Sequence, residues 1–282
     1  MNEIFVSTEW LNTAFYKNFL LLEVGNQARE IYRMGHIPHA HYFDTNWVER
    51  PPLWNCIPPA ELEQVLRAQG ITSDQRVVLY ARGTAAAARV GAILFYAGVK
   101  EVRLLDGGIE GWLAAGYPVE TGDHCPEPVS AFGLQIPARP EVFVDINTVK
   151  RMLQDENSLV ISVRSWAEYI GKTSGYTYIR PKGRIAGAMW GYAGTNKDLA
   201  YTTAEGHALP LVEVAQRWQK VGITPEKRVV FYCGTGWRAS EAYFYARALG
   251  SNQVSIYNGG WLEWSLDPAN PIETGPPNAA DG

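Results

Sequence analysis

Two hydrophobic patterns alternate along this chain. Continuous apolar runs of strand length occupy residues 19–24 (FLLLEV) and 158–163 (SLVISV). Residues 60–70 (AELEQVLRAQG) instead have helical spacing and close on a glycine, which is typical of a helix C-terminus. Strands that are apolar on both faces and alternate with helices indicate a parallel sheet covered by helices. We therefore expect an α/β fold.

The same pattern occurs twice. Residues 71–112 align without a gap with residues 223–264, and twelve of the 42 aligned positions are identical. Both copies contain a strand that begins Arg-Val-Val, and both later carry Pro-x-Glu-Thr-Gly. Each third strand is followed by a glycine pair, at residues 107–108 and 259–260, which we interpret as tight turns that need a positive φ. Two copies of one domain explain this self-similarity.

The predicted domains are residues 1–122 and 142–282, each a central parallel sheet flanked by helices. Between them, residues 123–141 are rich in proline and have no steady period, so we interpret them as an interdomain linker. A length of 282 residues also suits two domains.

Composition narrows the function classes. The chain is 46% apolar and 19% charged, with a net charge of −4 and no basic stripe, which argues against nucleic-acid binding. Its longest apolar stretch, residues 85–99, is too short to span a bilayer and contains Arg89, so no membrane partner is expected. We expect a soluble protein, cytoplasmic or, if a signal peptide was removed, periplasmic.

The three cysteines, Cys56, Cys125 and Cys233, are widely spaced. An odd number of cysteines in a chain of this size argues against a disulfide framework. Without C-x-x-C or H-x-x-x-H spacing, we expect neither a metal nor another cofactor. Cys56 and Cys125 lie in loop-like surroundings and are predicted to be non-catalytic.

Cys233 has a different setting. It follows the apolar run Val229–Tyr232 directly, and the carboxyl ends of parallel strands are where α/β proteins bind ligands. Gly234 and Gly236 let the backbone curl so that several N–H groups point at one centre, with a helix N-terminus behind them. Such a nest attracts an anion and would favour a thiolate or a persulfide. Arg238 adds a fixed cation with planar donors.

A buried core cysteine is the alternative interpretation of Cys233. It accounts for the thiol at a strand end but not for the Gly-x-Gly-x-Arg sequence that follows. We therefore predict a reactive cysteine.

These motifs resemble the rhodanese family of sulfurtransferases, over nearly the whole chain and in two copies. The motifs are CGTGWR (233–238), YNGGWLEW (257–264), GRIAGA (183–188), GHIPHA (35–40) and LLDGGIEGW (104–112). The likeness is greatest to the last two domains of a bacterial three-domain sulfurtransferase. It implies a five-stranded parallel sheet per domain, and an active site near the domain interface with catalysis in the second domain only.

The repeat supplies an internal comparison. Ala81 and Ala86 stand where the second copy has Cys233 and Arg238, so the first domain is predicted to be an inactive structural partner. The spacing from Cys233 to Arg238 is C-x₄-R, one residue shorter than the C-x₅-R ring of cysteine phosphatases. This spacing favours sulfur chemistry over phosphate chemistry.

The resemblance and the loop together predict a two-step displacement. Cys233 takes a sulfane sulfur from thiosulfate or 3-mercaptopyruvate, and an acceptor such as cyanide, a thiol or thioredoxin removes it. The predicted binding residues are Gly234, Thr235, Gly236, Trp237, Arg238 and Arg164. Arg164 is included because it matches an arginine that binds substrate anions in the family.

Three points stay open. Arg82 and Trp54 either reach toward the site or only pack, and the aromatic segment 171–183 either covers the site or is an ordinary surface loop. An alternative function is a persulfide relay module that receives sulfur from a protein partner and has little small-molecule activity.

Overall fold

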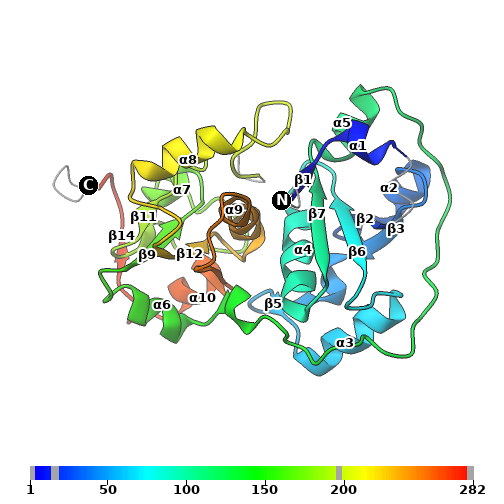
Figure 1. Cartoon of the computed structure of the whole chain (residues 1–282). Helices are drawn as coiled ribbons and strands as arrows, with labels where there is room; N and C mark the ends of the chain where they lie inside the picture. The colour runs from blue at the N-terminus through cyan, green and yellow to red at the C-terminus, as the bar shows by residue number, and fades with distance from the viewer. Residues whose placement is uncertain (1–3, 14–18, 195–198, 278–282) are drawn as a thin grey trace. The chain divides into compact units, whose positions relative to one another are not determined.

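The computed structural model describes residues 4–13, 19–194 and 199–277, and the chain divides into two compact units (Figure 1). Unit 1 comprises Met1–Pro51, Cys56–Pro140 and Thr203–Ala208. Unit 2 comprises Pro52–Asn55, Glu141–Thr202 and Leu209–Gly282. The predicted fold class, two parallel-sheet α/β domains, is confirmed. The exact boundaries at residues 122 and 142 stay a prediction.

Unit 1 is built on a five-stranded parallel sheet. Its strands, in spatial order, are β1 (Phe5–Val6), β7 (Glu101–Leu105), β6 (Arg76–Tyr80), β2 (Leu20–Gly25) and β3 (His41–Asp44). Its helices are α1 (Thr8–Leu11), α2 (Arg29–Met34), α3 (Pro59–Ala68), α4 (Ala86–Ala97) and α5 (Gly108–Ala114), with a 3₁₀ turn at Thr45–Trp47. The short strands β4 (Glu49–Arg50) and β5 (Asn55–Cys56) follow β3 along the chain.

Unit 2 repeats this topology. Its parallel sheet runs in the order β11 (Met189–Trp190), β9 (Ser158–Ser162), β12 (Arg228–Tyr232), β13 (Val254–Tyr257) and β8 (Phe143–Val144). Its helices are α6 (Ile146–Met152), α7 (Trp166–Tyr169), α8 (Leu211–Gln219), α9 (Trp237–Ala248) and α10 (Gly260–Leu266), preceded by a 3₁₀ turn at Pro140–Val142. The antiparallel pair β10 (Arg184–Ile185) and β14 (Ile272–Glu273) lies outside the main sheet.

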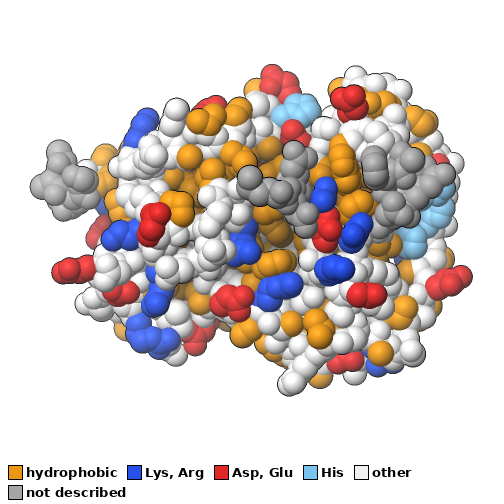
Figure 2. Space-filling model, viewed as in Figure 1, with side chains coloured by type: hydrophobic (Ala, Val, Ile, Leu, Met, Phe, Trp, Pro, Cys, Tyr) orange, Lys and Arg blue, Asp and Glu red, His pale blue; other side chains and the backbone are white. Residues whose placement is uncertain are grey.

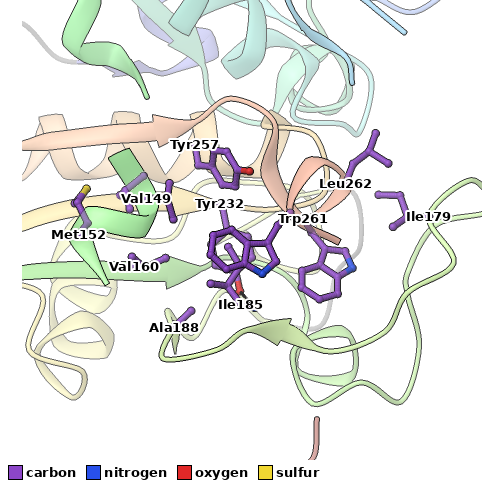
Figure 3. Close-up of a cluster of buried hydrophobic side chains, with 12 residues drawn as sticks. Val149, Met152, Val160, Ile179, Ile185, Ala188, Tyr232, Tyr257, Trp261 and Leu262 are labelled. Atoms are coloured by element: carbon purple, nitrogen blue, oxygen red, sulfur yellow. Dashed lines mark hydrogen bonds between the residues drawn. The ribbon is translucent and has the colours of Figure 1, made fainter. Parts of the chain in front are cut away.

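The central strands are the ones that the apolar runs predicted. In β12 every residue after Arg228 is buried. Helix α9 packs on one face of the sheet, over β12 and β13, and the opposite face of the sheet packs on a cluster of apolar side chains. Figure 3 shows Tyr232, at the end of β12, in this cluster beside Trp261 of α10 and Ile185 of β10. Burial on both faces explains why these strands read as continuous hydrophobic segments.

Matching contacts confirm that the two units are copies of one fold. The indole N–H of Trp112 donates to the carbonyl of Pro118 at 2.8 Å, and that of Trp264 donates to Pro271 at 3.0 Å. These hydrogen bonds connect the last helix of each unit, α5 or α10, to the Pro-x-Glu-Thr-Gly segment that follows it.

The glycine pairs meet the prediction at three of four positions. Gly107, Gly108 and Gly260 have φ values of 75°, 56° and 56°, whereas Gly259 is right-handed with φ −76°. Close approach also requires glycine at the second position of each pair. A Cβ on Gly260 would lie 2.5 Å from the carbonyl oxygen of Gly234, and one on Gly108 would overlap the carbonyl of Ala81.

Substituting Gly260→Ala is expected to destabilise the protein by about 2 kcal/mol or more, because it adds left-handed strain to a backbone clash. Gly108→Ala is the matched control, since it makes the same change in the copy without a thiol. Urea unfolding should show similar losses for both, whereas sulfur transfer should fall only in Gly260→Ala. Equal loss of transfer in both variants would contradict this prediction.

Candidate active site

The thiol of Cys233 lies at the carboxyl end of β12, between the strand and the N-terminus of α9. The backbone N–H of Gly236 donates to Cys233 Sγ at 3.2 Å, and Gly236 has φ 98°, a conformation that favours glycine. Cys233 is 1% exposed. The loop therefore curls back on its own sulfur, as its glycines predicted.

Helix α10 holds the loop in this curve. The N–H of Trp261 donates to the carbonyl of Cys233 at 2.8 Å, and the N–H of Leu262 donates to the carbonyl of Gly234 at 3.0 Å. With both carbonyls fixed by α10, the backbone keeps the bend that brings the Gly236 amide to the sulfur.

The amides of the loop do not all face the sulfur. The N–H of Gly234 donates instead to Tyr176 Oη at 3.0 Å, and a Cβ at Gly234 would overlap the Tyr176 ring. Tyr176 belongs to segment 171–183, so part of this segment packs directly on the thiol loop. Burial raises the pKa of Tyr176 to about 12, with Arg238 opposing the shift and Cys233 adding to it, so the phenol keeps its proton at neutral pH.

Arg238 is buried and bonded to protein oxygens. Its Nη1 and Nη2 each donate to a different carboxylate oxygen of Glu168 at 2.9 Å, in the bidentate geometry typical of arginine. Nη2 also donates to Tyr176 Oη at 2.6 Å. Arg238 thereby links the start of α9 to α7 and to segment 171–183. Its predicted direct contact with a substrate anion stays a prediction.

Arg164 is also fully buried. Its Nη1 donates to the carbonyl of Gly183 at 2.7 Å, its Nη2 to Ser174 at 2.8 Å, and its Nε to Glu168 at 3.3 Å. These bonds fasten both ends of segment 171–183. Anion binding by Arg164 stays a prediction, and it would require some of these bonds to be exchanged.

Glu168 joins the two arginines, and the sequence analysis missed it. Burial alone would raise its pKa, but Arg238 and Arg164 lower it to about 2. Glu168 also completes a capping box in which Ser165 is the N-cap of α7, and the Glu168 carboxylate accepts the N–H of Ser165 at 2.9 Å. The sequence Ser-x-x-Glu could have identified this helix start, but not the partner 70 residues away.

Two other predicted binding residues lie in the same loop. Thr235 is buried, and Trp237 is half-buried as the first residue of α9. The structure thus brings Gly234, Thr235, Gly236, Trp237 and Arg238 together around Cys233, while Arg164 lies behind them with Glu168.

The equivalent loop of unit 1 has a different arrangement. Ala81 takes the place of the thiol, and Arg82 forms an ion pair with the buried Glu23 at 2.7 Å. Arg82 therefore stabilises unit 1. Trp54, grouped with unit 2, packs against the hydrophobic cluster of that unit.

The remaining cysteines differ from Cys233. Burial raises the pKa of the Cys56 thiol to about 12, so it is protonated at neutral pH. Cys125 is exposed. Neither residue adjoins the glycine loop along the chain.

A second buried carboxyl lies one helical turn beyond Arg238. Burial raises the pKa of Glu241 to about 8, although the N–H of Ala200 donates to this carboxyl at 2.7 Å and Arg238 also lowers the pKa. The pKa values of Glu241 and Glu168 are thus shifted in opposite directions. Glu168 accepts hydrogen bonds from the guanidinium groups of Arg238 and Arg164, which stabilise its charged form.

Replacing Glu241 with glutamine is expected to raise stability at pH 8 but not at pH 4. The folded-state pKa lies above the unfolded value, so the contribution of Glu241 is fully present below about pH 4.3 and is lost as the pH rises toward 8. Glutamine keeps an oxygen that accepts the Ala200 N–H, and since it does not ionise, it avoids the loss of stability as the pH rises. The expected gain is a few kcal/mol, at about 1.4 kcal/mol per pKa unit. Unfolding curves that give the same difference at both pH values would contradict the assignment.

Comparison with known proteins places these features in a family. The profile of the rhodanese-like domain matches residues 7–115 and 145–267. The chain is 47% identical over 260 residues to thiosulfate sulfurtransferase YnjE of Escherichia coli, covering 90% of this chain and 59% of that protein. It is also 29% identical over 269 residues to a probable 3-mercaptopyruvate sulfurtransferase of Pseudomonas aeruginosa, covering 90% and 89% respectively.

Other relatives are named for different functions. The sulfur carrier protein TtuD of Thermus thermophilus is 28% identical over 291 residues, with 97% of each chain covered. The anaerobic ergothioneine biosynthesis enzyme from Chlorobium limicola, solved in complex with trimethyl histidine, superposes with a TM-score of 0.91 at 40% identity, over 97% of this chain and 71% of that one.

Within the described residues, every helix is too short or too polar to serve as a membrane span.

Proposed function

The chain belongs to the rhodanese family, and on that premise we propose that it is a sulfurtransferase in which Cys233 carries the sulfur. The donor is a small anion with a labile sulfur, thiosulfate or 3-mercaptopyruvate. The acceptor is a thiophile such as cyanide or a thiol. Unit 1, with Ala81 in place of the cysteine, takes no covalent part.

One contact carries this proposal: the Gly236 N–H at 3.2 Å from Cys233 Sγ, at the N-terminus of the 12-residue helix α9. A backbone donor and a helix N-terminus both stabilise negative charge on sulfur. A merely structural cysteine at a strand end needs neither of these features.

In the first half-reaction the Cys233 thiolate attacks the outer sulfur of thiosulfate. A bond forms between Cys233 Sγ and that sulfur, the S–S bond of thiosulfate breaks, and sulfite leaves with the electron pair. In the second half-reaction an acceptor thiolate or cyanide attacks the outer sulfur of the persulfide, and Cys233 leaves as the thiolate. No redox cofactor is needed, since both steps are displacements at sulfur.

Segment 171–183 is proposed to regulate access to this sulfur. Cys233 is 1% exposed, and Tyr176 packs on the thiol loop, where its hydroxyl accepts hydrogen bonds from Gly234 and Arg238. Tyr176 Oη accepts both of these hydrogen bonds. Its own O–H has no acceptor among the described residues and is therefore available as a donor. We propose that this hydroxyl donates to the sulfur that is being transferred, after the donor displaces part of the segment.

Substituting Tyr176→Phe is expected to lower kcat about 10- to 100-fold, because it removes a hydrogen-bond donor and frees two groups that it held. Tyr178→Phe is the control, since Tyr178 lies in the same segment and is exposed. Steady-state kinetics with saturating donor measures both variants. If the two substitutions have equal effects, Tyr176 has no part in the transfer.

A relay function is the second candidate, and the burial of Cys233 favours it. TtuD, which covers the chain almost end to end, is named a sulfur carrier protein. A relay would receive sulfur only from a protein partner that opens segment 171–183. The Chlorobium limicola neighbour adds a further candidate acceptor, a trimethylated histidine.

Donor-dependent turnover tests the proposal. Thiocyanate formation from cyanide should be measured with thiosulfate and with 3-mercaptopyruvate, and product formation with a thiol or trimethyl histidine as acceptor. Turnover with one of the small donors supports the enzyme. Loading of Cys233 only after addition of a persulfidated partner protein overturns it in favour of the relay.

A further inference from the structure

Unit 1 contains a second cluster of reactive side chains, separate from the thiol loop. One potential ligand atom each from His36, Glu120 and His124 lie within 4.8 Å of one another. Figure 2 shows histidine side chains gathered along the edge of unit 1, over α2 and β3. His36 follows α2, whereas the other two residues follow α5.

The backbone holds two of these residues in place. His36 and Glu120 form an isolated antiparallel bridge, in which each N–H donates to the other residue's carbonyl at 3.0 Å. The N–H of His124 donates to Tyr32 Oη at 3.2 Å, and the Tyr32 ring stacks on the His36 imidazole with centroids 4.0 Å apart. The three side chains are therefore positioned by the fold.

The tautomer of His36 leaves a lone pair inside the cluster. Its Nδ1 lies 2.9 Å from the carbonyl oxygen of Tyr32, and a carbonyl can only accept, so Nδ1 carries the hydrogen. The other nitrogen, Nε2, is buried without a hydrogen-bond partner and lies 3.4 Å from Glu120 Oε1. At this distance an Nε2 lone pair and a carboxylate oxygen repel each other unless a proton or a metal ion lies between them.

Unit 2 shows which cation the fold uses at the equivalent place. There Arg184 and Glu273 pair across β10 and β14, and Arg184 Nε donates to the Glu273 carboxylate at 3.0 Å. Unit 1 keeps the glutamate but replaces the arginine with His36. A guanidinium, which has no lone pair for a metal ion, has thus been exchanged for an imidazole, which can be a metal ligand, and His124 adds a second imidazole.

We propose that His36 Nε2, His124 Nε2 and Glu120 Oε1 bind a divalent transition-metal ion of the zinc class. Two imidazoles and a carboxylate are a ligand set suited to zinc, with water at the fourth position. Tetrahedral ligands at about 2.0–2.1 Å from zinc lie about 3.3 Å apart, which matches the His36–Glu120 distance of 3.4 Å. His124 Nε2, now 2.5 Å from Oε1, has to move outward by under about 1 Å.

The second shell also suits a metal site. Ligand histidines usually donate their other N–H to a backbone carbonyl, as His36 does to Tyr32. The N–H of His39 donates to Glu120 Oε1 at 2.5 Å, and His41 stacks on His124 with centroids 6.0 Å apart. A bound ion would clamp the segment after α5 onto the segment after α2. Sequence spacing predicted no metal because the ligands come from two distant segments.

Zinc titration of the chelator-treated full chain tests the proposal, by competition with a chromophoric chelator. His124→Ala is the informative variant, because His124 is partly exposed and its removal leaves the core intact. His207→Ala, a partly exposed histidine outside the cluster, is the control. We expect one zinc ion per chain, bound at least about tenfold more weakly by His124→Ala and unchanged in His207→Ala.

Cobalt substitution separates this site from the cysteines. A nitrogen and oxygen ligand set gives no thiolate-to-cobalt charge-transfer band, and binding should survive both Cys125→Ser and Cys233→Ser. The proposal is overturned if the wild-type chain binds no zinc, if His124→Ala binds it equally well, or if cysteine substitution abolishes binding. None of these results bears on sulfur transfer, which is measured separately.

Discussion

Substitution of Cys233 by serine is expected to reduce sulfur transfer to background, a loss of about four orders of magnitude or more. Serine preserves the size of the side chain and an acceptor for the Gly236 N–H, which lies 3.2 Å from the sulfur in the wild type. It cannot form a persulfide that releases sulfur to an acceptor. Thiocyanate formation from cyanide, with each small donor, is the measurement.

The other two cysteines provide the controls. Cys125→Ser alters an exposed thiol, and Cys56→Ser alters one whose pKa is raised by burial to about 12. Both variants should keep wild-type turnover. A Cys233→Ser protein that still turns over would show that the proposed nucleophile is wrong.

Removal of the Glu168 carboxylate is expected to have the largest effect on stability. In Glu168→Ala the guanidinium groups of Arg164 and Arg238 would both stay buried without their shared counter-charge. Breaking a buried ion pair in this way costs about 3–5 kcal/mol. Because Arg238 also holds Tyr176 over the thiol loop, sulfur transfer should fall together with stability.

The pH dependence distinguishes the charge from the packing of Glu168. Its pKa of about 2 in the folded state lies below the unfolded value of about 4.3, so its contribution is present above pH 4.3 and is lost as the pH falls toward 2. The difference corresponds to about 3 kcal/mol. Glu168→Gln should therefore be less stable than wild type at pH 7, and the gap should narrow at pH 3.

Urea unfolding at the two pH values measures this gap. Glu213→Gln is the control, because Glu213 pairs with Arg217 within helix α8 and is partly exposed. An exposed pair of this kind contributes about 0.5 kcal/mol or less. If Glu168→Gln and Glu213→Gln behave alike, the buried clamp does not stabilise the fold.

The fold could be predicted because its determinants are local. Apolar runs identified the central strands, and the repeat identified two domains. The edge strands β1, β8 and β11 were missed because each has only two residues, too few for any periodic pattern. Gly259 was wrong as a positive-φ position because the backbone needs only one left-handed residue there, at Gly260.

The site could be predicted only in part. The loop from Cys233 to Arg238 is continuous in sequence, and its glycines indicate a curled backbone. Glu168 and Tyr176 reach the loop through tertiary contacts, and neither carries a local signal of its partner. The pairing of Arg238 with Glu168 is likewise revealed only by the fold, and contact of Arg238 with a substrate anion stays a prediction.

The central claim is that Cys233 alone carries the transferred sulfur. Trypsin releases it on the peptide Val229–Arg238, which contains no other cysteine. After incubation with thiosulfate or 3-mercaptopyruvate, mass spectrometry should find one extra sulfur atom on this peptide, and cyanide should remove it. An unmodified Val229–Arg238 peptide from a protein that is turning over, or the added sulfur on Cys56 or Cys125 instead, would contradict the account.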